Sequence, residues 1–431
     1  MVPNFRVLLN AVRDRNKTMS RKDVDLHSNS STSIHPTSDH AIGNATITVI
    51  GLRGIPDISG GIETHCEYLY PKIAQLDANE NIVIVGRRPS MGSETISLGK
   101  NLKCVPLAAP ESRYFETIVN TFYGVLAARF RFQSKTVHLH AVGPGLMAPL
   151  ARFLGMQVIL THHGDDYKRD KWNRLARTVL KTGERLGIVF ANRVIAVSPS
   201  LAKRLKTEYP AKAEAIHYVP NGADHILSES GSDQSPMEDW LKKFNLADTS
   251  FIVSVGRLVP EKGFVDLIEA YAIARPNAKL VIVGGKSGSS HDDELTALIE
   301  DKNLDGSVIM TGAIPREGVA ALLKQAELFV LASHHEGLPI AALEASAMGA
   351  PTLVSDIQPN LDLGLPAGHY FPVNAPEALA QNLREKLGHI PPVDLLNIFN
   401  WDAIARQTSK IYHDLRKQEK GDNGFVKSEP T

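Results

Sequence analysis

The chain of 431 residues has little cysteine and no long apolar run. Its two cysteines, Cys66 and Cys104, are too few for a disulfide framework or a cysteine-based zinc site. No apolar run reaches the roughly 18 residues that a membrane-spanning helix needs. Residues 1–44 lack the apolar core and small-residue cleavage site of a signal peptide. We therefore expect a protein of the reducing cytoplasm.

Three common signatures of nucleotide and metal chemistry are also missing. The glycine-rich stretch after residues 46–51 does not read GxGxxG, which excludes the dinucleotide fingerprint. Gly285-Lys286-Ser287 matches the end of the Walker P-loop motif GxxxxGK[ST], but Leu280 stands where the first glycine of that motif should be. This excludes ATP hydrolysis of the P-loop type. No Asp-x-Asp lies between a strand and a turn, and the pair Asp292-Asp293 lies in a predicted loop. We expect no metal and no cofactor.

The formal net charge is zero, but the charge is unevenly distributed. Residues 46–220 hold 23 Lys and Arg against 14 Asp and Glu, whereas residues 221–400 hold 12 against 24. A basic half predicts an anionic partner. Basic and aromatic residues are not interleaved as in nucleic-acid binding modules, so we expect no nucleic acid. An anionic membrane or a lipid diphosphate fits better.

Strand-like and helix-like runs alternate along most of the chain, which predicts an α/β fold. Residues 1–44 are polar and rich in serine, so we expect a disordered tail, and we expect the same for residues 419–431. Between them we expect one domain over residues 45–221, a second over residues 222–400, and a helix over residues 401–418. Residues 114–132 indicate a helix packed on a core, with membrane contact as the alternative. Its apolar stripe consists of Phe115, Ile118, Phe122, Val125, Leu126 and Phe130.

The stretch from His335 to Glu344 combines a turn with a helix start. An apolar strand precedes it at residues 328–331, and a helix-forming run follows. Glu336 lies in the turn and Glu344 about two helical turns further on. A helix N-terminus after Gly337 and Pro339 is a natural anion site. Two solvated glutamates on an ordinary βα unit are the alternative interpretation.

A second βα turn carries two cations. Residues 251–255 predict a strand, and Gly256-Arg257-Leu258-Val259-Pro260-Glu261-Lys262-Gly263 follows it. Arg257 can form paired hydrogen bonds to phosphate oxygens, and Lys262 supplies a mobile point charge. An exposed ion-pair surface is the alternative interpretation.

These two stretches together resemble the retaining GT-B glycosyltransferases of family 4, also described as glycosyl transferases group 1. That family carries Glu-x7-Glu and an upstream Gly-Arg-x4-Lys-Gly, and both are intact here. The resemblance covers residues 46–415. The sequence from Gly51 to Thr64, Gly-x-Arg-Gly-Ile-Pro…Gly-Gly-x-Glu-Thr, resembles the corresponding segment of bacterial enzymes that build surface polysaccharides, rhamnosyltransferases among them.

The resemblance implies two Rossmann-like domains that face each other across a cleft, with the last helix crossing back to the first domain. It implies transfer of a hexose or deoxyhexose, with retention, from a nucleotide-diphosphate sugar. The acceptor would be a saccharide or a polyprenyl-diphosphate-linked sugar of bacterial exopolysaccharide, capsule or lipopolysaccharide. Another GT-B enzyme, such as a sugar-nucleotide epimerase, and a non-catalytic sugar-nucleotide binding protein are the alternatives.

Carried over position by position, the resemblance assigns the candidate site. His163, in Thr-x-His-Gly after the strand of residues 157–161, would lie by the donor sugar, with His162 as the alternative. The expected catalytic residues are His163, Arg257, Lys262 and Glu336. The expected donor-binding residues are Gly60, Gly61, Gly285, Gly337, Leu338, Pro339, Ile340 and Glu344. Of these, Glu344 would bind the ribose. For Gly60-Gly61, a turn that only reverses the chain is the alternative.

A basic stripe follows on the predicted helix after Lys171. Its cations are spaced three, four and four residues apart and so share one face: Arg174, Arg177, Lys181 and Arg185. Trp172, Leu175, Val179 and Leu186 lie towards the other side, which makes the predicted helix amphipathic. The stripe predicts an acceptor or membrane face, with peripheral contact at the cytoplasmic face of the inner membrane. A solvated face over an ordinary core stripe is the alternative.

Overall fold

The structure is a computed structural model that describes residues 44–110, 116–169, 172–229, 235–285 and 291–422. Almost all of the two tails that we expected to be disordered, residues 1–43 and 423–431, therefore lies outside the described residues. Within the described ranges, no helix combines the length and the hydropathy needed to cross a bilayer.

An eight-stranded sheet forms the first half of the fold, in the order β3-β4-β2-β1-β5-β6-β7-β8. Every neighbouring pair is parallel except β3 with β4. The inner strands are continuous buried runs, as expected for a sheet covered on both faces. The strands are β1 (Ile47–Ile50), β2 (Ile82–Arg87), β3 (Ile96–Ser97), β4 (Leu102–Leu107), β5 (Thr136–His140), β6 (Gln157–His162), β7 (Arg193–Ala196) and β8 (Ile216–Tyr218).

The helices of this half follow the strands as crossover connections. They are α2 (Gly61–Leu76), α3 (Arg88–Met91), α4 (Glu116–Phe130), η3 (Pro144–Met147), α5 (Ala148–Phe153), η4 (Asp166–Lys168), α6 (Arg174–Phe190), α7 (Pro199–Glu208) and η5 (Pro210–Ala215). Helix α6 approaches η3 closely through glycines. A Cβ on Gly183 would lie 2.3 Å from the Val142 carbonyl oxygen, so no larger residue fits there without a shift.

A second sheet has six parallel strands in the order β11-β10-β9-β12-β13-β14. Its strands are β9 (Phe251–Val255), β10 (Lys279–Val283), β11 (Val308–Gly312), β12 (Leu328–Leu331), β13 (Thr352–Ser355) and β14 (Tyr370–Phe371). Its helices are α8 (His225–Glu229), α9 (Ser235–Lys243), η6 (Pro260–Lys262), α10 (Phe264–Ala274), α11 (His291–Asp301), α12 (Arg316–Gln325), α13 (Ile340–Ala347), α14 (Gln358–Leu361), η7 (Ala367–His369) and α15 (Pro376–Lys386). The predicted pair of Rossmann-like α/β units is confirmed.

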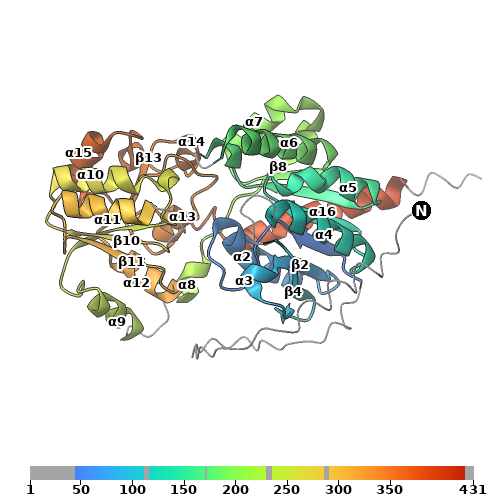
Figure 1. The fold of residues 1–431 in the computed structure, drawn as a ribbon, viewed down its shortest axis with the longest axis horizontal. Coiled ribbons are helices and arrows are strands. Elements are labelled where there is room, and N and C mark those ends of the chain that lie inside the picture. Colours follow the sequence, from blue (N-terminus) through green and yellow to red (C-terminus); the bar gives the residue numbers. More distant parts are fainter. Residues whose placement is uncertain (1–43, 111–115, 170–171, 230–234, 286–290, 423–431) are drawn as a thin grey trace, which may run out of the picture. The chain divides into compact units, whose positions relative to one another are not determined.

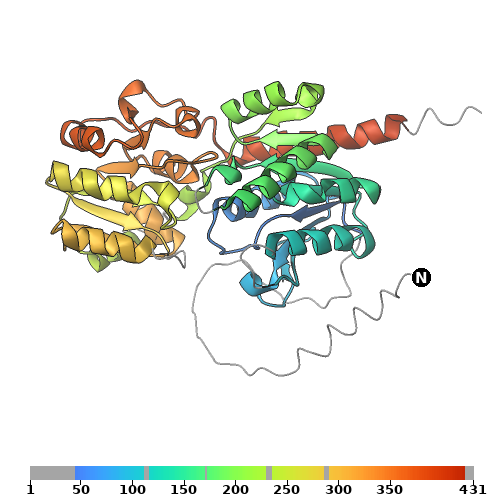
Figure 2. The same ribbon diagram turned by 45° about the horizontal axis from the view of Figure 1, so that its top comes forward.

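The last helix, α16 (Trp401–Asp422), packs on α2 of the first half. In Figure 1 it lies in red among the blue and green elements of the first sheet, and Figure 2 gives the same arrangement from another side. Lys72 pairs with Asp402 at 2.5 Å, and the Tyr412 hydroxyl bonds His138 Nδ1 at 2.6 Å. The helix extends four residues beyond the predicted end at residue 418.

Part of the predicted core stripe on α4 is exposed. Val125 is fully buried, but 40% of Phe122 and 64% of Phe130 are accessible to solvent. The buried side of α4 instead consists of Asn120, Thr121, Gly124, Val125 and Ala128, and a Cβ on Gly124 would lie 3.1 Å from the Ile50 side chain. The prediction that Phe122 and Phe130 belong to the core was therefore wrong.

Candidate active site

The candidate site lies where the parallel strands of the two sheets end, since ligands of open α/β sheets bind at the carboxyl ends of the strands. In the second sheet, the loop after β12 is hydrogen-bonded to the turn after β9. His334 N donates to the Glu261 carbonyl oxygen at 2.9 Å. Gly263, with φ of 66°, has no room for a side chain, because a Cβ would lie 1.9 Å from the Ala332 carbonyl oxygen. The two loops therefore form one unit.

Lys262 and Glu336, both predicted to be catalytic, are paired within this unit. Lys262 Nζ donates to Glu336 Oε1 at 2.6 Å, and the Ser333 hydroxyl donates to the same oxygen at 2.7 Å. Only 19% of the Lys262 side chain and 10% of the Glu336 side chain are accessible, so bulk water screens the pair weakly. The pair fixes the direction of both side chains.

Arg257 lies near two further arginines that the sequence reasoning missed. Partial desolvation lowers the pKa of Arg257, and the positive charges of Arg169 and Arg53 lower it further. Arg169 is held by Asp166 at 2.9 Å, and Arg53 by Glu63 at 3.0 Å. Three guanidinium groups are therefore gathered at this point, and two of them are already paired with a carboxylate. The sequence feature that could have identified Arg53 was its position in the motif Gly-x-Arg-Gly at residues 51–54.

Backbone groups at two helix starts complete the polar surface. Leu338 and Pro339 lead into α13, which starts at Ile340 without a side-chain cap. Gly60, with φ of 154°, precedes α2, which also lacks a side-chain cap, and a Cβ on Gly61 would meet nothing within 4 Å. Such starts leave backbone N–H groups for an anion.

The predicted donor-binding Gly285 follows β10 beside the turn after β9. The Leu258 N–H donates to its carbonyl oxygen at 3.4 Å. A Cβ on the preceding glycine, Gly284, would lie 1.9 Å from the Gly256 carbonyl oxygen. Glycine is needed there because the two strand ends approach closely.

The loop after β6 meets the loop after β12. A Cβ on Gly337 would lie 1.7 Å from the His163 carbonyl oxygen, and a Cβ on Gly164 would lie 2.9 Å from the Gly337 Cα. His163 therefore stands beside the turn that carries Glu336, although the two residues are 173 positions apart in the sequence, belong to different motifs and follow strands of different sheets. The structure thus brings together residues that the sequence could only assign separately.

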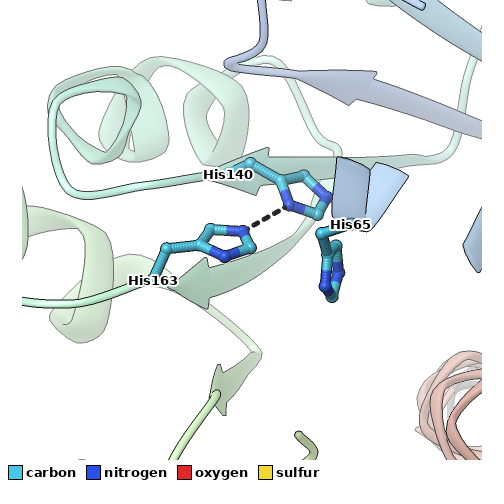
Figure 3. A group of neighbouring side chains, drawn as sticks. All are labelled: His65, His140 and His163. Carbon is cyan, nitrogen blue, oxygen red and sulfur yellow. Dashed lines mark hydrogen bonds between the residues drawn. The ribbon is translucent and has the colours of Figure 1, made fainter. Parts of the chain in front are cut away.

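His162 and His163 have different surroundings. His162 is fully buried, its Nε2 is 2.7 Å from Glu184 Oε2, and its Nδ1 accepts from the Gly164 N–H at 3.2 Å. His163 is half-buried and shares a 2.9 Å hydrogen bond between its Nε2 and His140 Nδ1 (Figure 3). The geometry supports His163 rather than His162 as the residue facing the site.

His163 belongs to a group of histidines with His65 and His140 (Figure 3). One nitrogen from each lies within 4.8 Å of the others, so the group could hold a metal ion. However, His140 and His163 already bond each other, and His65 Nδ1 bonds Asn221 Oδ1 at 2.8 Å. Burial lowers the pKa of His65 to about 4 and that of His163 well below its usual value. We interpret the group as a neutral hydrogen-bonded support for His163.

Glu344, the predicted ribose ligand, is buried on α13. Its Oε1 lies 2.8 Å from His225 Nε2. The sequence reasoning gave no role to His225, which follows the expected boundary between the domains.

The basic stripe of α6 is largely at the surface. Arg174, Lys181 and Arg185 are exposed, whereas Arg177 is half-buried. Leu175, on the apolar side of the predicted amphipathic helix, is 74% exposed. The buried residues of α6 all lie in its second half, where Gly183 and Gly187 approach neighbouring backbone closely.

The buried carboxylate of Glu184 should make stability depend on pH. Burial alone would raise its pKa, but hydrogen bonds and charge from His162 and Arg204 lower it below the usual 4.5. A lowered pKa stabilises the folded state above pH of about 4.5, and this contribution is lost as the pH falls further. We expect Glu184→Gln to flatten the fall in unfolding free energy between pH of about 5 and 3, measured by urea titration. Glu208→Gln, which removes an exposed partner of Arg204, is the control. An unchanged slope in Glu184→Gln would contradict the assignment.

Comparisons with known proteins identify the family and the fold. Residues 59–226 match the model of Glycosyltransferase Family 4, and residues 236–387 match that of Glycosyl transferases group 1. The capsular polysaccharide biosynthesis glycosyltransferase CapM of Staphylococcus aureus is 23% identical over 64% of this chain and 76% of its own. Sucrose-phosphate synthase of Thermosynechococcus elongatus has a TM-score of 0.75 at 22% identity, over 87% of this chain and 100% of that one. HepE of Anabaena, solved with UDP-glucose, has a TM-score of 0.62 at 17% identity, over 87% and 99%. The chain belongs to the GT-B glycosyltransferases of family 4.

Proposed function

We propose that the chain transfers a hexose or deoxyhexose from a nucleoside diphosphate sugar to a lipid-linked or saccharide acceptor in bacterial polysaccharide synthesis, with retention of configuration. The observation that carries the proposal is the convergence of Arg257, Lys262 and the start of α13 on one strand-end site. HepE, which shares the fold, was solved with UDP-glucose, and CapM is named for capsule synthesis.

The cations would assist departure of the nucleoside diphosphate. Arg257 forms paired hydrogen bonds to phosphate oxygens, and Arg53 and Arg169 add positive charge nearby. The uncapped N–H groups at the start of α13 and the Lys262 ammonium stabilise the charge that develops on the leaving oxygen. These groups perform the task for which other enzymes use a divalent cation, so the proposed reaction needs no metal.

Glu336 would bind hydroxyls of the donor sugar, and Glu344 would bind the ribose. Glu336 is not the nucleophile of a double displacement. Its Oε1 already accepts hydrogen bonds from Lys262 and Ser333, which lowers its nucleophilicity. We therefore favour a front-face step. The acceptor oxygen bonds to C1 as the bond from C1 to the phosphate oxygen breaks, and the acceptor proton passes to that phosphate oxygen. His163 would face the sugar from the first sheet.

One experiment separates this function from its alternatives. The protein is incubated with a panel of sugar nucleotides, with and without bacterial membrane extract, and the products are identified by mass spectrometry. Sugar transfer that requires the extract or an added saccharide supports the proposal. Conversion of the sugar nucleotide without an acceptor would indicate an epimerase. Tight binding without turnover would indicate a binding protein.

Substitution of the paired residues tests the active site. We expect Lys262→Ala and Glu336→Gln each to lower the turnover number roughly 100-fold or more, because each removes a group that stabilises charge or orients the sugar. Lys324→Ala, at an exposed position on α12, is the matched control. Circular dichroism verifies that the variants fold. Turnover close to that of the wild type in either variant would remove that residue from the site.

Removal of metal tests how the leaving group is stabilised. We expect activity to persist after EDTA treatment and desalting, because three arginines, Lys262 and a helix start supply the positive potential. Initial rates are compared with and without added Mg²⁺ or Mn²⁺. A loss of activity that either cation restores would contradict the metal-independent step.

We further propose that α6 contacts anionic membrane or the diphosphate of a lipid-linked acceptor. Arg174, Lys181 and Arg185 present exposed charge along the helix, and the exposed Leu175 stands beside Arg174. Exposed cations beside an apolar side chain suit the interface of an anionic bilayer, where each cation contributes about 1 kcal/mol.

A triple substitution tests this surface. We expect the change of Arg174, Lys181 and Arg185 to Gln to reduce co-sedimentation with anionic vesicles at low salt and to reduce activity on a lipid acceptor in parallel. The matched control changes three exposed cations of the second half, Lys242, Lys243 and Lys324, to Gln. Equal sedimentation of the triple variant and the wild type would show that the stripe is only a solvated face.

A further inference from the structure

A buried histidine outside the family motifs holds the carboxylate of Glu344. His225 is the first residue of α8, and Glu344 lies in α13. Both are almost fully buried, with 5% and 8% of their surface accessible. His225 Nε2 lies 2.8 Å from Glu344 Oε1. The contact joins the segment between the two sheets to the helix that carries the predicted donor ligands.

Trp401 determines which nitrogen of His225 carries the proton. The indole Nε1 of Trp401 donates to His225 Nδ1 at 3.0 Å. An indole N–H can only donate, so Nδ1 must be the acceptor, and the proton of the neutral ring stands on Nε2. A doubly protonated ring would direct a second N–H against the indole N–H. His225 is therefore a neutral donor to Glu344 in a single tautomer.

The plane of the His225 ring is also fixed. Tyr68 of α2 stacks on it with ring centroids 4.0 Å apart and an angle of 25° between the planes. Trp401 is completely buried, and its backbone N–H donates to Asp224 Oδ1 at 2.6 Å. A Cβ on Gly222 would lie 2.7 Å from the Trp401 ring, so the segment before His225 packs directly on the indole.

We propose that His225, oriented by Trp401, is a positioning residue that directs the Glu344 carboxylate to the ribose of the donor. His225 occupies Oε1, which turns the second oxygen to a ribose hydroxyl. The inference rests on the proposed function, since it takes Glu344 as a nucleotide ligand. It adds two residues to that site: His225, which precedes the second sheet, and Trp401, at the start of the last helix.

The tautomer can be tested without any ligand. In protein labelled with ¹⁵N-histidine, two-bond ¹⁵N–¹H correlations distinguish a protonated Nε2 from a protonated Nδ1, and His225→Phe identifies the signal. We expect wild-type His225 to be protonated at Nε2 only. In Trp401→Phe, which keeps an aromatic ring without the N–H, we expect a mixture of tautomers or a charged ring. Protonated Nδ1 in the wild type would overturn the proposal.

The effect on ribose recognition is tested by a cycle that combines protein and ligand changes. Binding of ADP, GDP and UDP is compared with binding of their 2′,3′-dideoxy forms by calorimetry, in the wild type, His225→Phe, His225→Gln and Trp401→Phe. We expect the wild type to lose roughly 10- to 100-fold in affinity with the dideoxy form of its preferred nucleotide. His225→Phe keeps the stacked ring and should lose most of this discrimination, and His225→Gln, which restores an N–H, should regain part of it.

The possible outcomes distinguish a failure of the proposed function from a failure of the positioning role of His225. If the wild type binds none of the nucleotides, or binds the ribose and dideoxy forms equally, the role of Glu344 in the proposed function fails. If the wild type discriminates and folded His225→Phe discriminates equally well, the positioning role of His225 fails while the proposed function stands. A general loss of stability would weaken both forms of the nucleotide alike, so it would not reproduce a selective loss for the ribose form.

Discussion

The site depends on the close approach of two backbone loops from different sheets. The loop after β6 and the loop after β12 meet at His163, Gly164 and Gly337, where no Cβ would fit at either glycine. Parallel strands make this meeting possible, because every strand of a parallel sheet ends at the same edge. Two such edges supply backbone N–H groups, cations and carboxylates to a single region. Packing at the glycines sets how near those groups come to one another.

Pairing within the site determines what each charged group can do. Lys262 pairs with Glu336 at 2.6 Å, Arg169 with Asp166 at 2.9 Å and Arg53 with Glu63 at 3.0 Å, so each of these three cations already faces a carboxylate. An anion such as a diphosphate that met Arg257 would share the neighbouring cations with their carboxylates. The histidines next to this region are held neutral by burial and by hydrogen bonds to one another, so they add polarity without further charge.

Much of the fold could be predicted from the sequence, because strand-like runs, turns and helix starts alternate regularly. The two motif-bearing turns were also predictable, since Arg257 and Lys262 lie between β9 and α10, Glu336 lies in the loop after β12, and Glu344 lies in the helix that follows that loop. The partners of these residues were not. The pairing of Lys262 with Glu336 spans 74 positions, and the bond between His225 and Glu344 spans 119. Such contacts depend on how distant loops pack, and no local pattern of residues carries that information.

The failure to predict which apolar side chains are exposed has a related cause. Hydrophobic periodicity marks the side of a helix that is able to pack, but it does not give the width or the length of the covering elements. Phe122, Phe130 and Leu175 follow the apolar pattern and are nevertheless exposed. Arg53 and Arg169 were missed for the opposite reason, since each is a single cation in a loop and acquires its significance only from the other arginines around it.

The place of Trp401 near the end of the chain has a consequence for biosynthesis. During translation both sheets emerge from the ribosome before α16 does, because the last strand ends at Phe371. A nascent chain at that stage contains every motif residue, yet His225 still lacks the indole that fixes its proton. The proposed nucleotide site would therefore reach its final form only when the last helix has been made and has packed on α2, so the order of synthesis would set the order in which the site matures.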